Sequence, residues 1–70
     1  MLDDEKTRHS ALRAWRQKER LSLQEMSDLS GYSLAMLSRL ESGQRSASFR
    51  TKVAISRRLR VPIRELFPVA

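Results

Sequence analysis

The stretch LSLQEMSDLSGYSLAMLSRLESG, residues 21–43, contains two short helix patterns separated by one glycine. Ser22 and Glu25 have the S-x-x-E spacing of a capping box, in which each side chain bonds the backbone N–H of the other residue. We therefore expect a helix over Leu23–Ser30. Gly31 follows it, and glycine tolerates best the positive φ that commonly ends a helix.

A second helix pattern follows this glycine. Ser33 can cap a helix over Leu34–Ser42, and Gly43 can end it in the same left-handed conformation. Two short helices joined by a tight turn that contains glycine are typical of a helix-turn-helix, whose second helix can enter the major groove of DNA. The sequence therefore predicts a helix-turn-helix over about residues 22–43.

Length and composition exclude several classes of protein. The 70 residues contain no cysteine and one histidine, so they offer neither a disulfide nor the ligands of a zinc site. A chain of this size is expected to form one domain, residues 1–70, with a small helical core that dimerisation would support. No apolar run approaches the ~20 residues of a membrane span. The N-terminal residues also lack the order of a signal peptide, so we expect a cytoplasmic protein without a membrane partner.

The chain is strongly basic, with a formal net charge of +6 and a pI near 11.1. Eleven of its 14 basic residues are arginine, whose planar fork suits phosphate groups and guanine edges. Charge alone is equally compatible with nucleic-acid binding and with a solvated basic surface. A membrane-surface helix is disfavoured because no segment joins a strong apolar face to a lysine-rich one.

Three further helices are predicted outside residues 22–43. The first follows the acidic residues 3–5, runs to about Glu19 and places Ala11, Leu12 and Trp15 inward, with residues 1–5 expected to fray. Another, Phe49–Leu59, is capped by Ser48. Residues at helical spacing along it are Phe49, Val53, Ser56 and Leu59.

The last predicted helix is short. Pro62 fits its first turn, where a missing N–H costs little, and Pro68 ends it. Its residues Ile63, Leu66 and Phe67 face the core or a partner. No alternating strand pattern occurs anywhere in the sequence, so the predicted fold is all-α, compact and built from five helices.

From Leu12 to Phe67 the chain resembles the Cro/CI-type (XRE-like) helix-turn-helix family. The matching stretches are LRAWR, LSLQEMSDLSGYS, LSRLESGQRSAS and LRVPIRELF, and they align without a gap. The resemblance implies a five-helix DNA-binding domain that usually works as a dimer in transcriptional control.

The resemblance also implies structural roles for individual residues. Met26, Leu37 and Leu40 take the buried positions between the two hinged helices. Arg16 and Glu41 match a partly buried ion pair, with a phosphate contact as the competing interpretation of Arg16. Losing one partner of a buried pair costs about 3–5 kcal/mol.

Two sets of residues match the family's DNA-facing positions. The base-facing positions are Ser33, Leu34, Ala35, Ser38 and Arg39. The phosphate-facing positions are Ser22, Leu23, Ser42, Gly43, Gln44, Arg45 and Ser46. Backbone N–H groups at the starts of the helices after Ser22 and Ser48 could bind phosphates as well.

This chain departs from the family pattern in having an apolar recognition helix. Arg39 could pair with guanine O6 and N7, while Leu34 and Ala35 could meet thymine methyl groups. The exposed edge Leu34, Ala35 and Met36 could instead dock a protein, although Met36 also suits the core. Leu23, Leu29 and Leu34 could form one apolar ridge. At the end of the first helix, Arg20 stands where the family usually has glycine, in a left-handed conformation that costs about 1–2 kcal/mol.

The surface of a homodimer has a natural candidate near the C-terminus. Its apolar residues are Val61, Ile63, Leu66, Phe67 and Val69, which could instead close the core of the monomer. The basic residues Arg57, Arg58 and Arg60 form either a solvated face or a contact to phosphate or dimer partner.

The leading hypothesis is a dimeric, sequence-specific regulator of transcription, most simply a repressor, on inverted repeats of double-stranded DNA. The alternative is an anti-activator or antirepressor that binds a protein through its apolar recognition helix. An enzyme is disfavoured because no nucleophile–base pair or phosphate loop is visible. No cofactor, metal or small-molecule substrate is expected.

Overall fold

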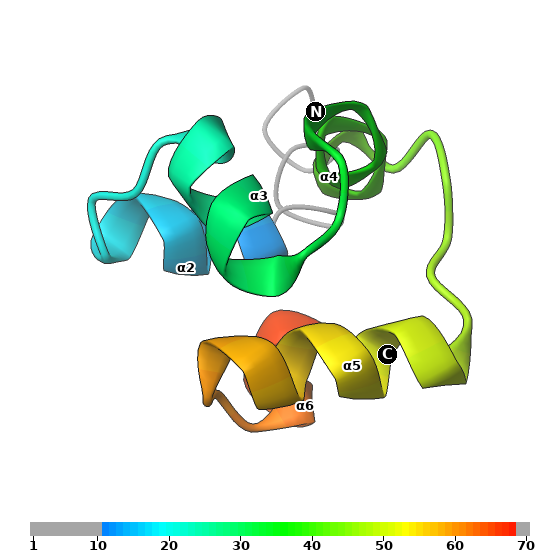
Figure 1. Ribbon diagram of the computed structural model, residues 1–70. Coiled ribbons are helices and arrows are strands. Elements are labelled where there is room, and N and C mark those ends of the chain that lie inside the picture. Colours follow the sequence, from blue (N-terminus) through cyan, green and yellow to red (C-terminus); the bar gives the residue numbers. More distant parts are fainter. Residues whose placement is uncertain (1–10, 69–70) are drawn as a thin grey trace, which may run out of the picture.

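The computed structural model describes residues 11–68, which form five helices (Figure 1). In chain order these are α2 (Ala11–Lys18), α3 (Leu23–Ser30), α4 (Leu34–Ser42), α5 (Phe49–Leu59) and α6 (Ile63–Leu66). No strand occurs between residues 11 and 68, and the predicted all-α fold is confirmed. Acidic residues 3–5, the predicted fraying and Val69 lie outside the described residues. Within the described part of the chain, no helix combines the length and apolar character needed to cross a bilayer.

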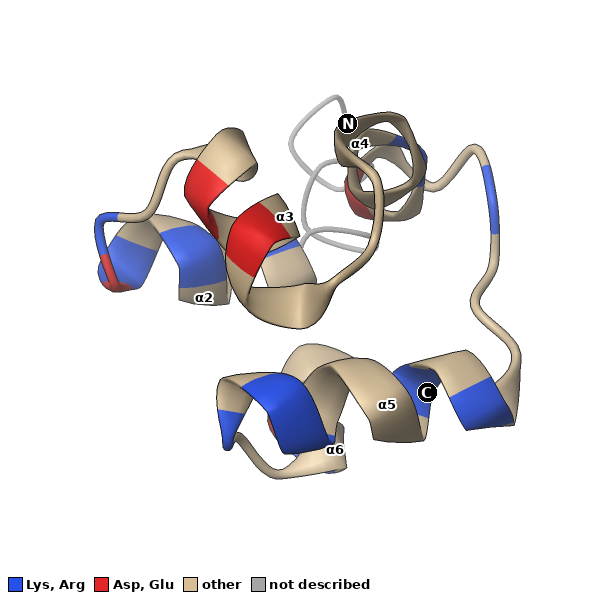
Figure 2. Cartoon of the chain, viewed as in Figure 1, with Lys and Arg blue, Asp and Glu red and all other residues tan. Residues whose placement is uncertain are grey.

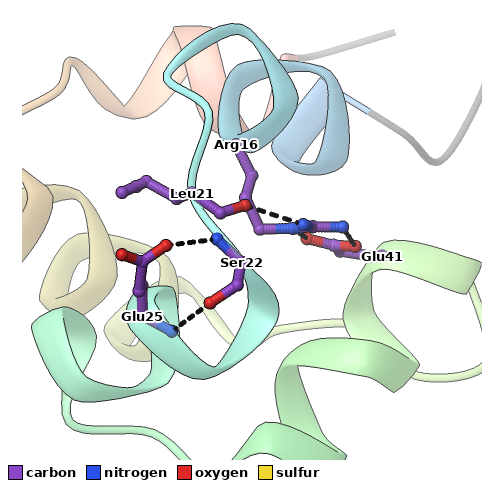
Figure 3. A network of polar contacts seen from close by, with 5 residues as sticks. All are labelled: Arg16, Leu21, Ser22, Glu25 and Glu41. Carbon is purple, nitrogen blue, oxygen red and sulfur yellow. Dashed lines mark hydrogen bonds and ion pairs between the residues drawn. The ribbon is translucent and has the colours of Figure 1, made fainter.

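Serine caps and left-handed glycines set the bounds of α3 and α4, as the sequence predicts. The Ser22 hydroxyl accepts from the Glu25 N–H at 3.0 Å, and the Ser22 N–H donates to the Glu25 carboxylate at 2.7 Å (Figure 3). Ser33 accepts from the Met36 N–H at 3.1 Å. Gly31 and Gly43 end the two helices with φ of 82° and 81°.

The core is small, and every described helix contributes to it. Its buried apolar side chains are Leu12 from α2, Met26 from α3, Leu37 and Leu40 from α4, Ile55 from α5 and Leu66 from α6. Trp15 and Phe67 pack against this cluster as half-buried side chains. Because each helix supplies so few buried residues, none can bury its apolar face without the others.

The face of α5 that enters the core agrees only in part with the predicted stripe of Phe49, Val53, Ser56 and Leu59. Ser56 is buried and Leu59 packs against the core, but Phe49 is 75% exposed. Ile55, which the predicted stripe omits, is fully buried in that face. Lys52 adds to it, with its stem beside the core and its ammonium 5.8 Å from the Phe67 ring. A second apolar stripe, containing Phe49 and Val53, is therefore left outside the core.

An ion pair joins α2 to α4. The Arg16 guanidinium donates to the two Glu41 carboxylate oxygens at 2.7 and 3.1 Å, and to the Leu21 carbonyl at 2.9 Å (Figure 3). The side chains are 15% and 7% exposed, so the predicted structural pair is partly buried. The hydrogen bond to Glu41 raises the pKa of Arg16 despite desolvation. Since a raised folded-state pKa stabilises the fold at every pH below it, the pair is fully effective at neutral pH.

Two arginines adopt the left-handed conformation at helix ends. Arg20, after α2, has φ of 59°, as its position in the family pattern predicts, and Arg60, after α5, has φ of 61°. The second was not predicted from the sequence. A residue with a Cβ pays about 1–2 kcal/mol in this region, so both ends store strain that glycine would avoid.

Replacing Glu41 with leucine should reduce the free energy of unfolding by about 3–5 kcal/mol, because Arg16 would keep a buried, uncompensated charge. That is a large part of the ~4–10 kcal/mol expected for a domain of this length. The paired variant Arg16→Met/Glu41→Leu should recover most of the loss. Urea unfolding measures both, and equal destabilisation by the single and paired variants would contradict this account.

Replacing Arg20 with glycine should raise the free energy of unfolding by about 0.5–1 kcal/mol. The gain is the left-handed strain of about 1–2 kcal/mol, reduced by the extra freedom of glycine in the unfolded chain. Arg20→Ala is the matched control, because it removes the same side chain and keeps the Cβ. Thermal and urea unfolding should show a gain for glycine only.

Candidate nucleic-acid interface

The turn between α3 and α4 is held by side-chain hydrogen bonds as well as by the core. The Ser27 hydroxyl donates to the Tyr32 carbonyl at 2.6 Å, and the Tyr32 N–H donates to the Ser30 hydroxyl at 3.2 Å. Met26 and Leu37 are completely buried on the facing sides of the two helices. These contacts fix the direction of α4 relative to α3. In Figure 1, α4 is seen almost along its axis.

The predicted base-facing residues share the outer face of α4. They are Ser33, Leu34, Ala35, Ser38 and Arg39, and all five are exposed. From Leu34 onward they follow the i, i+1, i+4, i+5 spacing of one helix face, opposite Leu37 and Leu40. The core therefore fixes which side of α4 is presented to a ligand.

This outer face combines a few hydrogen-bonding groups with apolar surface. The Arg39 and Ser38 side chains make no hydrogen bond to any residue between 11 and 68, so their donors are available. Ser33 accepts from the Met36 N–H as a helix cap, and its hydroxyl hydrogen can still donate. Leu34 is 42% exposed beside them. The face can thus meet both polar and methyl groups of a base edge.

The predicted apolar ridge is interrupted. Leu29 on α3 is 50% exposed, like Leu34 on α4, but Leu23 is half-buried against the core. Met36 is also half-buried there, in agreement with the core interpretation. Of the two predicted apolar surfaces, only Leu29, Leu34 and Ala35 remain well exposed.

Most predicted phosphate-facing residues are exposed, but their backbone donors are partly occupied. The exposed residues are Ser22, Ser42, Gly43, Gln44, Arg45 and Ser46, while Leu23 is half-buried. The N–H groups of Gln44 and Arg45 donate to the Arg39 carbonyl at 3.0 and 3.3 Å. The Gly43 N–H also donates to backbone carbonyls in the last turn of α4, those of Arg39 and Leu40. Phosphate contacts from this loop therefore fall to side chains, above all those of Gln44 and Arg45.

The charges are unevenly distributed over the helices (Figure 2). Every charged residue of α5 is basic, whereas α3 carries only the acidic residues Glu25 and Asp28. On α4, Glu41 is paired with Arg16, which leaves Arg39 as the cation of the outer face. No three side chains of metal-binding type lie together among residues 11–68.

One basic residue of α5 has a specific position that the sequence does not reveal. A Cβ built on Gly31 would lie 3.5 Å from Nη1 of Arg58, so this guanidinium sits against the helix-turn-helix turn. The carbonyl end of α3, which carries partial negative charge, is there. Arg58 is nevertheless exposed, as the solvated-face interpretation of this basic run expects.

A sequence profile described as Helix-turn-helix matches residues 12–66. The chain belongs to the helix-turn-helix family. It is accordingly a DNA-binding transcriptional regulator and not an enzyme, and the resemblance to the Cro/CI-type proteins is confirmed.

Among solved structures, the restriction-modification controller protein C.AhdI from Aeromonas hydrophila is similar, with 29% sequence identity and a TM-score of 0.77. The alignment covers 93% of this chain and 98% of that one. No curated protein sequence matches the chain closely enough to count as a relative.

The predicted dimer residues do not form one surface. Leu66 is buried in the core of its own protomer, and Val61 and Phe67 are half-buried against it, so the monomer-core interpretation holds for these three. Val61 and Ile63 line an open groove, together with Phe49 from α5. The sequence placed Phe49 in the helical stripe of α5, but it did not indicate that this side chain is exposed beside Val61 and Ile63.

Proposed function

We propose that the protein binds specific sequences in double-stranded DNA as a homodimer and acts as a transcriptional repressor in the cytoplasm. Each protomer places α4 in the major groove of one half of an inverted repeat. The observation that carries this proposal is the outer face of α4, where Ser33, Ser38 and Arg39 are exposed and hydrogen-bonding groups are available. That face is held in a fixed direction by Met26, Leu37 and the turn.

Base recognition rests mainly on Arg39. Its guanidinium has two parallel donors that match O6 and N7 of guanine, a pairing worth about 1–3 kcal/mol of discrimination. Ser33 and Ser38 add single hydrogen bonds to base edges. Leu34 and Ala35 contact thymine methyl groups, which lie in the same groove.

The backbone of the duplex is held by groups around α4. The side chains of Gln44 and Arg45, the hydroxyls of Ser22 and Ser46, and the first-turn N–H groups of α3 and α5 contact phosphates. Ser42 reaches a phosphate only by exchanging the hydrogen bond that its hydroxyl donates to the Arg39 carbonyl. Gly43 brings its backbone close to the duplex, and Leu23 adds only an apolar contact. About 4–5 phosphates per protomer are within the capacity of this set, which gives binding a strong dependence on salt.

The likeness to a restriction-modification controller protein supports a control function for this chain and makes the genes of such a system its candidate targets. Two-fold symmetry requires half-sites about 34 Å apart, one turn of the double helix.

A second candidate function is anti-activation or antirepression, in which α4 binds a protein instead of DNA. The exposure of Leu29 and Leu34 favours it. The half-buried position of Met36 weighs against it, because it removes one residue of the edge that would dock the partner.

Replacing Arg39 with alanine should weaken binding by about 1–3 kcal/mol per half-site and relax the preference at one base pair. The DNA is obtained by selecting bound fragments from a random duplex library with the wild-type protein, and affinity is then measured by fluorescence anisotropy. Arg13→Ala, on the exposed side of α2, is the matched control, since it removes the same charge away from α4. Equal losses for both variants would refute base recognition by Arg39.

Affinity for the selected duplex should fall steeply with salt. With about 8–10 phosphates contacted by a dimer, the slope of log K against log salt concentration should be near −7 to −9, at about −0.9 per phosphate. The Arg45→Ala variant should reduce the magnitude of the slope by about 2 per dimer, while Arg13→Ala leaves it unchanged. A flat salt response, or no duplex selected at all, would favour the protein-binding alternative.

A further inference from the structure

A groove of about 220 Å³ lies where the two ends of the described chain meet. Ala11 at the start of α2 and Pro68 after α6 both line it. Apolar side chains, among them those of Leu40 and Phe67, form much of its wall. Residues 1–10, which lie outside the described part of the chain, therefore join the protein at the rim of this groove.

The groove is electropositive. Arg45 and Lys52 line it, and no acidic residue between positions 11 and 68 does. The Lys52 ammonium lies 5.8 Å from the centre of the Phe67 ring, and neither cation forms an ion pair with a carboxylate of residues 11–68. Arg45 is exposed and Lys52 is half-buried. Two cations beside apolar walls focus a positive potential, which favours an anionic occupant.

The residues that precede the groove carry such anions. Three of the eight acidic residues of the chain are Asp3, Asp4 and Glu5. Glu5 is six residues before Ala11, and a chain of that length spans up to about 20 Å, enough to cross a groove whose rim it adjoins. The basic residues at positions 6 and 8 separate this block from the rim, so the anionic ligand is the block and not the whole segment.

We propose that Asp3, Asp4 and Glu5 bind this groove of their own protomer, with carboxylates on Arg45 and Lys52, and so compete with DNA. The consequence for DNA rests on the proposed function, in which the Arg45 side chain contacts a phosphate. One guanidinium cannot serve a carboxylate in the groove and a phosphate of the duplex fully at the same time. The acidic block is thus an internal competitor of the DNA backbone.

Tethering makes weak contacts sufficient for this competition. Each exposed ion pair is weak and is screened by salt. A segment joined to the rim of its binding site nevertheless has an effective concentration of the millimolar order. Attachment at Ala11 favours this occupant over a free anion or a second copy, since the segment is present at every protein concentration. Because the contact is weak, DNA displaces it, so it raises the protein concentration needed to occupy an operator without preventing binding.

The first measurement detects the contact without DNA. The chain contains no cysteine, so Leu2→Cys provides a single site for a nitroxide label, nine residues before the rim. At low salt the label should broaden the backbone amide signal of Lys52 more than that of Arg57, which lies outside this groove. Adding Asp3→Asn/Asp4→Asn, or raising the salt concentration, should restore the Lys52 signal.

The label is also placed on one copy and the isotope for detection on another, in a mixed sample. Broadening should then be absent, because the contact is within one protomer. Equal broadening in the mixed sample would overturn the proposal, as would a Lys52 signal that is broadened no more than that of Arg57.

The second measurement asks whether the contact limits DNA binding. At low ionic strength Asp3→Asn/Asp4→Asn should raise affinity for the selected duplex by about threefold to tenfold, because Arg45 is released. Glu19→Gln/Glu65→Gln is the matched control: it changes the net charge equally at two exposed residues that do not line the groove. Its effect should stay below about twofold. Equal gains for both pairs would contradict a specific contact.

A double-mutant cycle with Lys52→Met separates the groove from a general effect of charge. Methionine keeps an apolar stem beside the core and removes the ammonium, and Lys52 is not among the residues proposed to contact DNA. In this background the gain from Asp3→Asn/Asp4→Asn, on a logarithmic scale, should fall by about half or more. An unchanged gain would mean that the acidic residues act through net charge or a helix dipole, and would overturn the proposal.

Failure of the proposed function gives a different pattern. If the nitroxide contact forms and depends on Asp3 and Asp4, but no variant binds any duplex, the assignment of the groove stands and DNA recognition is wrong. If DNA is bound and the contact is absent, the proposed function stands and this inference is wrong.

Discussion

The arrangement of the helices depends on one contact, the bidentate ion pair between Arg16 and Glu41. One guanidinium ties α2 to the carboxylate of α4 and to the carbonyl of Leu21, one residue before the cap of α3. One cation thus holds the end of α2, the segment before α3 and, 25 residues further along the chain, α4. Because the pair is mostly shielded from water, its geometry must be satisfied as a unit, and this fixes where α4 emerges from the protein.

The core and the residues proposed to meet DNA occupy different sides of α4. Leu37 and Leu40 bind α4 to the core, whereas Ser38 and Arg39, next to them in sequence, contribute nothing to it. The same division holds for α5, where Ile55 is buried and Phe49 is exposed. Side chains that meet a ligand can therefore change with little effect on the free energy of unfolding, since they remove no buried contact.

Local signals made most of the fold predictable from the sequence. The caps at Ser22, Ser33 and Ser48 have specific side-chain chemistry, and the bounds of α3, α4 and α5 agree with the prediction. The face of α5 was not predictable in the same way, because Phe49 and Ile55 belong to adjacent apolar stripes and only tertiary packing selects one. The positive φ of Arg60 and the place of Arg58 beside Gly31 likewise depend on contacts distant in sequence. The residues proposed to contact DNA follow from family resemblance, and the structure shows only that most are exposed.

The backbone carbonyl of Arg39 accepts hydrogen bonds from Ser42, Gln44 and Arg45. The residue proposed to recognise guanine is thus attached to a heavily restrained piece of main chain, and only its own side-chain torsions remain to be ordered on complex formation. Little conformational entropy of the backbone is lost at that moment. A different side chain at position 39 would be held by the same restrained backbone. Substitution at this single position could therefore change the preferred operator without changing the fold.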